Sequence, residues 1–461
     1  MSLLDHPQAQ ELLREAHIPP TALAGWPQRL QGFLQRYLPC FFRREHRDLV
    51  PLVLAGKLSN LERKTAEPIA RQAGRPRKPV QHFVGAGKWD DEAVLDELRH
   101  HVAFEVGATD GVLILDGSGF PKSGAASCGV ERQWCGRLGK IDNCQVGVFL
   151  GYASRRGQAL VDRRLYLPQS WAADSARRAQ GQVPEGVAFQ TKLDIGLDLL
   201  ARCRGLPHGW VLGDDEFGRS ADFRGQLRRR GERYLLDVPG NTAVRDLEER
   251  GPDGRKPPFE RADAWAARQP AHRWRRLTVR DGEKGRVVVR ALVALVQTKD
   301  EEGCVGRSER LLVVRPVDRA GDTTYAVTND VRQTGLAALV RIKHQRHAVE
   351  QLFQEGKGEV GLGHYEVRSW VGWHHHMTLS LLALWYLLLE RRQVGGKNPG
   401  VDGAAATPAT GGVAGAGADA SATVRRGQRC RPAHGGGPHL PLAPHQQPLP
   451  TATREAGFLD R

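Results

Sequence analysis

Two short apolar runs, each closed by an aspartate, constrain this chain more than any other feature of its sequence. The runs GVLILD and GWVLGD end at Asp116 and Asp214, and the glycines that punctuate them are typical of buried strands. A carboxylate seldom stays beside a hydrophobic core unless a metal ion or a cation pairs it. The two strand ends therefore predict a shared divalent ion. Glu350, in a helix-like segment, is expected to supply the third ligand.

The pattern around these runs predicts a mixed α/β sheet between about residues 106 and 240. Three strands in a meander come first, at GVLILDGSG, NCQVGVFLGYAS and QALVDRRLYL. A helical stretch, the strand GWVLGD, an arginine-rich helix and the strand RYLLDVP follow. In such an order Asp116 and Asp214 would lie on neighbouring strands.

The remaining segments differ from this region in composition and in sequence pattern. Residues 1–105 are rich in helix formers with two basic clusters, which fit either a helical DNA-binding domain or a solvated face packed on the main domain. Within a catalytic domain at 106–395, short alternating runs predict a β-rich insertion at about 240–320, followed by one long helix from about Gly335 to Gly356. Residues 396–461, rich in Gly, Ala and Pro, are expected to be disordered, and a frameshift in GC-rich DNA is our hypothesis for their origin.

Composition narrows the class of protein. The chain has 461 residues, of which 40% are hydrophobic, and this is enough for a sizeable core. Lys and Arg outnumber Asp and Glu by 67 to 52, so the net charge of +15 indicates a nucleic-acid partner, or else an arginine-rich GC-rich genome. Seven cysteines without a CxxC pair fit a reducing cytoplasm. The longest apolar run, around Leu379 to Leu389, is too short to span a bilayer and is expected to be a core helix, so no membrane association is predicted.

A second group of residues accompanies the third acid. Arg346, Glu350 and Lys357 are spaced by four and seven residues, so they share one face of a helix, while Val349 and Leu352 can face the core. Carboxylate oxygens suit Mg²⁺ (or Mn²⁺), and two ions about 4 Å apart can activate an attacking water and stabilise the leaving oxygen in phosphodiester cleavage. The two cations are expected to hold the DNA phosphate beside the metal ligands.

These residues resemble the DDE transposases of bacterial insertion sequences, particularly the group with a Tyr-Arg-Glu-Lys signature. The resemblance rests on the three acids, the GDDEFG segment and HAVEQLFQEGKGEVGLGHYEVRSWVGWHHHMTLSLLAL, and it covers roughly residues 20–395. The spacings of Arg346, Glu350 and Lys357 match the signature, but Lys343 stands at the position of its tyrosine.

The resemblance implies an RNase H-like catalytic core in which Asp116, Asp214 and Glu350 are both the catalytic residues and the metal ligands. It implies an enzyme that cleaves element ends with two metal ions and uses the freed 3′ hydroxyl to attack target DNA. A homodimer on double-stranded DNA, associated with the nucleoid in a bacterial cytoplasm, is the expected working form. Arg346, Lys357 and Lys343 are the expected DNA contacts among its basic residues.

Two tryptophans of the insertion are candidates for the aromatic side chain on which related enzymes stack a flipped base. They are Trp265 and Trp274, of which Trp274 is the predicted DNA contact. Packing between strands is the alternative for each.

Several other polar residues have competing interpretations. Asp215 adjoins Asp214, but Asp214 stands three residues before Phe217 of the family's Phe-Gly pair and is favoured as the ligand. Asp142 is interpreted as a turn residue, and Lys122 as an exposed loop lysine that could also reach a phosphate. The run His374, His375 and His376 is interpreted as packing and DNA-proximal residues, because adjacent histidines on a helix point to different faces.

Two other functions compete with an active transposase. A catalytically decayed or regulatory protein that occupies element ends would keep the basic surface without the chemistry. A glycosidase would use paired carboxylates, but this function does not explain the net charge of +15.

Overall fold

The computed structural model describes residues 25–393, except 252, 283–284, 300–302, 304, 318–320 and 332. The predicted tail at 396–461 and the first 24 residues lie outside the described residues. The described part combines helices with one mixed sheet, which confirms the predicted RNase H-like α/β class with a helical N-terminal part. The division of the chain into the predicted domains stays a prediction.

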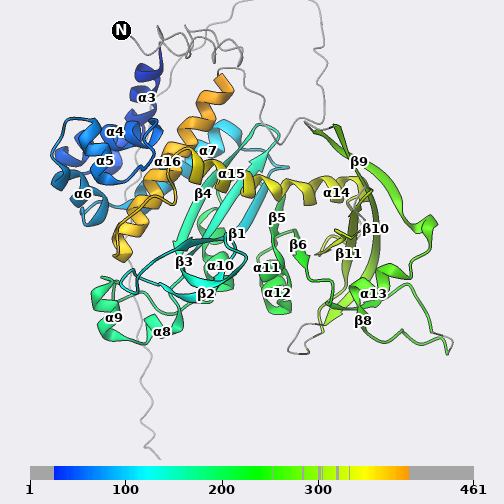
Figure 1. Ribbon diagram of the computed structural model, residues 1–461. Helices are drawn as coiled ribbons and strands as arrows, with labels where there is room; N and C mark the ends of the chain where they lie inside the picture. Colours follow the sequence, from blue (N-terminus) through cyan, green and yellow to red (C-terminus); the bar gives the residue numbers. More distant parts are fainter. Residues whose placement is uncertain are drawn as a thin grey trace, which may run out of the picture. The chain divides into compact units, whose positions relative to one another are not determined.

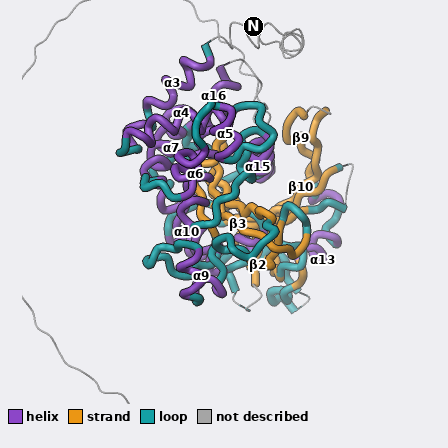
Figure 2. The backbone as a smooth tube through the Cα atoms, turned by 60° about the vertical axis from the view of Figure 1, so that its left-hand side comes forward, coloured by secondary structure: helices purple, strands orange, loops and turns teal. Residues whose placement is uncertain are grey.

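The N-terminal part is built from short helices that lie together (Figure 2). In chain order they are α3 (Trp26–Gln35), the 3₁₀ turn η2 (Leu38–Cys40), α4 (Arg44–Leu58), α5 (Ala66–Gln72), α6 (Arg77–Gly85) and α7 (Asp91–Val106). Helix α7 begins where the Asp90 carboxylate accepts hydrogen bonds from the backbone N–H groups of Glu92 and Ala93. This cap satisfies two donors that the first turn leaves free.

The first half of the sheet follows the predicted order of strands and helices (Figure 1). Its strands are β1 (Val112–Pro121), β2 (Glu131–Cys135), β3 (Lys140–Ser154), β4 (Gly157–Leu165), β5 (Trp210–Gly213) and β6 (Tyr234–Val238). The helices between them are α8 (Gln169–Ala172), α9 (Ser175–Gln180), α10 (Lys192–Arg202), α11 (Asp215–Gly218) and α12 (Ala221–Arg229). Strands β1, β5 and β6 run parallel, and Leu115 lies opposite Gly213. The predicted neighbouring placement of Asp116 and Asp214 is confirmed.

The insertion is β-rich, as predicted, and its strands continue the same sheet. It comprises β7 (Ala243–Asp246), β8 (Glu260–Arg261), α13 (Ala262–Ala267), the 3₁₀ turn η3 (Ala271–Arg273), β9 (Arg275–Gly282), β10 (Gly285–Lys299) and β11 (Glu309–Pro316), before β12 (Thr324–Thr328). Because β12 pairs with both β11 and β6, the described strands follow the order β2-β3-β1-β5-β6-β12-β11-β10-β7-β8. Strand β4 pairs with β3, and β9 pairs with β10.

The helix that carries the third acid is divided in two, which corrects the prediction of one long helix. Helices α14 (Leu336–Gln345) and α15 (His347–Gly358) meet at Arg346 and run end to end (Figure 1). At the junction the backbone makes tighter bonds three residues apart, from the Arg346 N–H to the Lys343 carbonyl and from the Val349 N–H to the Arg346 carbonyl. Such a turn leaves Arg346 at the start of α15, one turn before Glu350.

Helix α16 (Trp370–Gln393) is buried along most of its length, and it packs against α4, α6, α7 and strand β4. A single large core extends from Leu30 in α3 to Leu388 in α16, and it includes the interiors of β1, β3 and β5. The predicted core helix around Leu379 to Leu389 is confirmed. Among the described residues, no helix is both long enough and apolar enough to cross a membrane.

The three adjacent histidines of α16 are packing residues. His374, His375 and His376 are buried, and their rings bond three different backbone carbonyls, those of Trp370, Trp89 and Leu362. The ring of His375 also stacks on Trp89 with centroids 3.8 Å apart. Because the three rings bond different partners, they do not converge on one ligand, as the sequence predicted.

Candidate active site

The direction of Asp116 follows from its place in β1. Side chains alternate between the two faces of a strand, so Asp116 shares a face with Ile114. Ile114 lies opposite Gly151 of β3, where a Cβ atom would come within 3.3 Å of the Val349 side chain in α15. Asp116 therefore faces α15, the helix that carries Glu350.

Asp214 follows β5 directly and caps the short helix α11. Its carboxylate accepts a hydrogen bond from the Glu216 backbone N–H at 3.1 Å. The adjacent Asp215 instead pairs with Arg219 at 2.8 Å, and its side chain is 48% exposed. Of the two aspartates, the geometry favours Asp214 as the group that faces Asp116.

Arg346 lies at the centre of the carboxylates. Its Nη2 is 2.8 Å from Glu350 Oε1, its Nη1 is 3.6 Å from Asp116 Oδ2, and its Nε is 3.2 Å from Asp237 Oδ2. Glu350 is also bonded through its other oxygen to His347 Nδ1 at 2.8 Å. Residues from β1, β6 and α15 thus converge on one guanidinium at the junction of α14 and α15.

The pKa values of the acids show how much negative charge the site gathers. Burial, reinforced by the charge of Asp214, raises the pKa of Asp116 to about 7. Burial and the neighbouring charges of Glu216 and Asp215 raise the pKa of Asp214 to about 6. The pKa of Glu350 is lowered instead, first by its hydrogen bond with His347 and then by Arg346. Two of the three acids would therefore ionise more fully if a further cation lay between them.

The donor set fits a hard divalent cation, although the side chains are not preassembled. Among residues 25–393 as described, no three His, Cys, Asp or Glu side chains form a ready metal-binding group. Both oxygens of Glu350 are already bonded, one to Arg346 and the other to His347. Carboxylate oxygens are nevertheless the ligands that Mg²⁺ and Mn²⁺ prefer, and a guanidinium already occupies the position of a cation among them. Asp116 and Glu350 both contact that guanidinium, so an ion held by these two acids and Asp214 would first have to displace it.

The three predicted phosphate-binding cations lie in different environments. Arg346 lies among the acids, whereas the Lys343 ammonium pairs with Asp237 and its side chain is only 9% exposed. Lys357 is in the last turn of α15, with its Nζ 5.6 Å from the centroids of the Phe120 and Phe353 rings. Burial, followed by the charge of Arg137, lowers the pKa of Lys357. Lys357 is thus the cation of the three that carries no carboxylate contact in the described structure.

The two tryptophans of the insertion are not equivalent. Trp265 is fully buried in the small core of the insertion, where its Nε1 donates to Asp246 at 3.2 Å. This confirms a packing role for Trp265. Trp274 is half-buried, and the Arg315 guanidinium lies 3.8 Å from its ring centroid. Of the two rings, Trp274 is the more exposed, and Arg315 already lies against it.

Sequence reasoning missed one member of the site, Asp237. A usable signal existed, because the run YLLD ends an apolar strand with an aspartate in the same way as the runs before Asp116 and Asp214. Strand β6 neighbours β5, so Asp237 reaches the same edge of the sheet. Its carboxylate contacts both Lys343 and Arg346.

Two polar residues, Asp142 and Lys122, lie outside the group of acids. Asp142 is not the turn residue that was predicted, because it lies within strand β3, opposite Gln133 of β2. Its carboxylate pairs with Lys140 at 3.0 Å and accepts a hydrogen bond from the Asn143 N–H. Lys122 is not the exposed loop lysine that was predicted. It is half-buried, with its Nζ 3.4 Å from the Tyr365 ring centroid, because the loop after β1 folds back against the segment that precedes α16.

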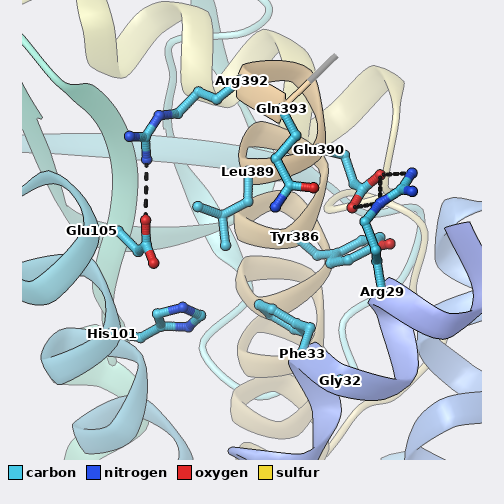
Figure 3. Close-up of a pocket in the computed structure, with 10 residues that line it drawn as sticks. All are labelled: Arg29, Gly32, Phe33, His101, Glu105, Tyr386, Leu389, Glu390, Arg392 and Gln393. Carbon is cyan, nitrogen blue, oxygen red and sulfur yellow. Dashed lines mark hydrogen bonds and ion pairs between the residues drawn. The ribbon is translucent and has the colours of Figure 1, made fainter. Parts of the chain in front are cut away.

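A pocket of about 420 Å³ lies apart from the acids, among residues of α3, α7 and α16 (Figure 3). Two ion pairs, Arg29 with Glu390 and Arg392 with Glu105, border it, and the Phe33 and Tyr386 rings line it. None of the acids around Arg346 contributes to this pocket. It therefore has no place in the candidate active site.

Comparison with known proteins gives an independent view of the same residues. A family model described as "DDE superfamily endonuclease" matches residues 36–286, and one described as "Transposase DDE domain" matches residues 188–386. The first span contains Asp116 and Asp214, and the second contains Asp214 and Glu350.

A curated relative points in the same direction. The chain is 28% identical over 202 residues to the probable transposase for insertion sequence element IS701 from Microchaete diplosiphon. The match covers 42% of this chain and 49% of the relative, so the chain spans about half the length of that protein.

Proposed function

This chain belongs to the DDE superfamily of endonucleases, and from that premise we propose that it is a DNA transposase of a bacterial insertion sequence. The proposed reaction is cleavage of the ends of the element followed by joining of the freed ends to target DNA. One observation carries the proposal: Asp116, Asp214 and Glu350 come from three elements to one edge of the sheet, around Arg346.

The proposed roles follow from the contacts of each group. Asp116, Asp214 and Glu350 hold two Mg²⁺ (or Mn²⁺) ions through their carboxylate oxygens. When bound, such ions lower the pKa of the attacking water or 3′ hydroxyl and stabilise the leaving oxygen. Water attacks the phosphorus and the P–O3′ bond breaks, which leaves a 5′ phosphate and a 3′ hydroxyl. That hydroxyl then attacks a phosphodiester of the target DNA, where a new P–O bond forms and the 3′ oxygen of the target strand leaves.

The cations position the DNA for that attack. Lys357, at the end of α15 and without a carboxylate partner among the described residues, contacts the phosphate next to the reacting one. Arg346 contacts the reacting phosphate once its bonds to Asp116 and Glu350 are replaced. Lys343 and Trp274 are further proposed DNA contacts, with Trp274 offering its ring to a base.

The proposed partners are double-stranded element ends and target DNA, bound by a homodimer near the nucleoid of a bacterial cell. The excess of Lys and Arg gives the chain a net charge of +15, which supports binding to a polyanion. A protein that occupies element ends without cutting them is the alternative that the following experiment separates.

The test is cleavage of DNA that carries the ends flanking this gene, in Mg²⁺ and in EDTA. We expect nicking with a 3′ hydroxyl product for the wild type, and a loss of at least 100-fold in Asp116→Ala, Asp214→Ala and Glu350→Ala. Asp215→Ala is the matched control, because it removes the adjacent carboxylate, which pairs with Arg219, and it should keep near-wild-type cleavage.

Two outcomes would contradict the proposal. Equal losses in Asp214→Ala and Asp215→Ala would remove the assignment of Asp214. Specific binding of the ends by the wild type without any cleavage in Mg²⁺ or Mn²⁺ would move the protein to the decayed or regulatory class.

A further inference from the structure

Asp237 lies beside the proposed active site without being one of its three acids. It occupies β6, where its backbone pairs with Ala326 of β12, so the strand that carries it is interior to the sheet. Its carboxylate is 21% exposed and forms ion pairs with Lys343 and with Arg346 Nε. An interior strand makes Asp237 a fixed anchor at the junction of α14 and α15.

The anchor determines where Arg346 points. A guanidinium is planar, and its N–H groups leave it in fixed directions. With Nε held by Asp237, the Nη1 and Nη2 groups are directed toward Asp116 and Glu350, at 3.6 Å and 2.8 Å. Asp237 thus selects the orientation in which one cation bridges two of the acids.

Several carboxylates share the single guanidinium of Arg346. The acids that face the guanidinium are Asp116, Asp214, Glu350 and Asp237. A divalent ion at the first three acids must compete with Arg346 for Asp116 and Glu350. An arginine without another carboxylate would resist this displacement, because it would be left as a partly buried, unpaired cation. Asp237 offers the partner that Arg346 can keep.

We propose that Asp237 is a positioning residue that holds Arg346 as an internal cation between Asp116 and Glu350, and retains it beside the site when a divalent metal ion replaces it there. The part that concerns metal ions rests on the proposed function. Lys343, at the position of the signature's tyrosine, completes the arrangement by pairing with the same carboxylate. Asp237 itself contacts neither the metal ion nor the DNA.

The first test is a double-mutant cycle on the full-length protein in EDTA, with Asp237→Asn, Arg346→Gln and the double variant. Each single substitution removes the same contact. We therefore expect the two Tm decreases of the single variants, added together, to be clearly larger than the Tm decrease of the double variant. Additive changes would overturn the proposal, whatever the protein does with metal ions.

The second test is direct binding of Mn²⁺, measured by calorimetry. We expect Asp237→Asn to weaken the Kd about tenfold, and Asp237→Glu, which keeps the charge, to restore it to within about threefold. In the Arg346→Gln background the substitution Asp237→Asn should change the Kd less than twofold. Asp215→Asn is the matched control for losing one nearby negative charge, and it should change the Kd less than threefold.

The outcomes separate this proposal from the proposed function. Equal weakening by Asp237→Asn and Asp215→Asn, or an undiminished effect without Arg346, would show general electrostatics and overturn the positioning role. If the wild type fails to bind Mn²⁺, the metal-ion function and the metal part of this proposal both fail, and the cycle in EDTA still decides whether Asp237 holds Arg346.

Discussion

At the scale of single residues, the site gathers several carboxylates around one guanidinium. Asp116 is 14% exposed and Asp237 is 21% exposed, yet both face one guanidinium that must also serve Glu350. Lys343 also pairs with Asp237, so two cations serve these three carboxylates. The raised pKa values of Asp116 and Asp214 come first from burial and then from neighbouring carboxylates, and they indicate a site in which a divalent cation would stabilise the ionised acids.

We predict that Asp116→Asn stabilises the protein in EDTA at pH 8. The pKa of Asp116 is raised by burial to about 7 in the folded protein, above its unfolded value, so ionisation costs stability as the pH rises from about 4 to 7. Asparagine avoids that cost, and we expect the free energy of unfolding to rise by about 1–2 kcal/mol at pH 8 and hardly at all at pH 4. Urea unfolding at both pH values measures this.

The exposed Asp222, whose side chain is 73% exposed, provides the control. Asp222→Asn should show no such dependence on pH. A lower stability of Asp116→Asn than of the wild type at pH 8 would contradict the prediction.

At the scale of elements, the contact between α4 and α16 contains a buried amine. Lys57 of α4 is 1% exposed and donates to the Ser380 hydroxyl of α16 at 2.8 Å. Burial, followed by the charge of Lys64, lowers the pKa of Lys57 to about 7. A hydroxyl compensates a buried ammonium poorly, so this contact joins the N-terminal helices to α16 at a cost in stability.

We predict that Lys57→Met stabilises the protein most at low pH. Below pH 7 both the folded and the unfolded chain carry the proton, so the folded state bears the full cost of burying the charge, and this cost falls as the pH rises toward 10. We expect the free energy of unfolding to rise by about 1–3 kcal/mol at pH 6.5 and by less at pH 9.5.

The same unfolding measurements on Lys78→Met supply the control, because Lys78 is exposed on α6. That variant should be neutral at both pH values. If Lys57→Met were less stable than the wild type at pH 6.5, the bond to Ser380 would outweigh the burial cost and the interpretation would be wrong.

At the scale of the described molecule, one sheet connects the acids to the insertion. Strand β12 pairs with β6 next to the site and with β11 of the insertion. Backbone hydrogen bonds therefore run without interruption from the strand of Asp116 to the strands beside Trp274. A net charge of +15 accompanies this framework, and it determines how the protein should respond to salt.

We predict that binding of the element ends weakens steeply with salt. A protein that neutralises six to ten phosphates loses about 10³-fold or more in affinity between 50 and 200 mM salt, because counterions are released from the DNA. Fluorescence anisotropy with labelled DNA measures the slope of log K against log salt. Lys357→Gln should reduce the slope by about one. An affinity that is insensitive to salt would contradict the electrostatic account.

The sequence by itself determined most of the strands and helices, and it predicted the three acids. Apolar periodicity is local, so the runs before Asp116 and Asp214 indicated adjacent strands, and the spacing of Arg346 and Glu350 indicated that they share one helix face. The buried course of α16 followed from its apolar composition in the same way.

Only the tertiary structure decided what surrounds the acids. The burial of Lys343 and the place of Asp237 beside Arg346 depend on contacts between residues about one hundred positions apart in the chain. Local patterns carry no information about such pairs, because packing of β6 against the junction of α14 and α15 brings the charges together. Once packed, a planar guanidinium among fixed carboxylates has few orientations that leave every charge paired.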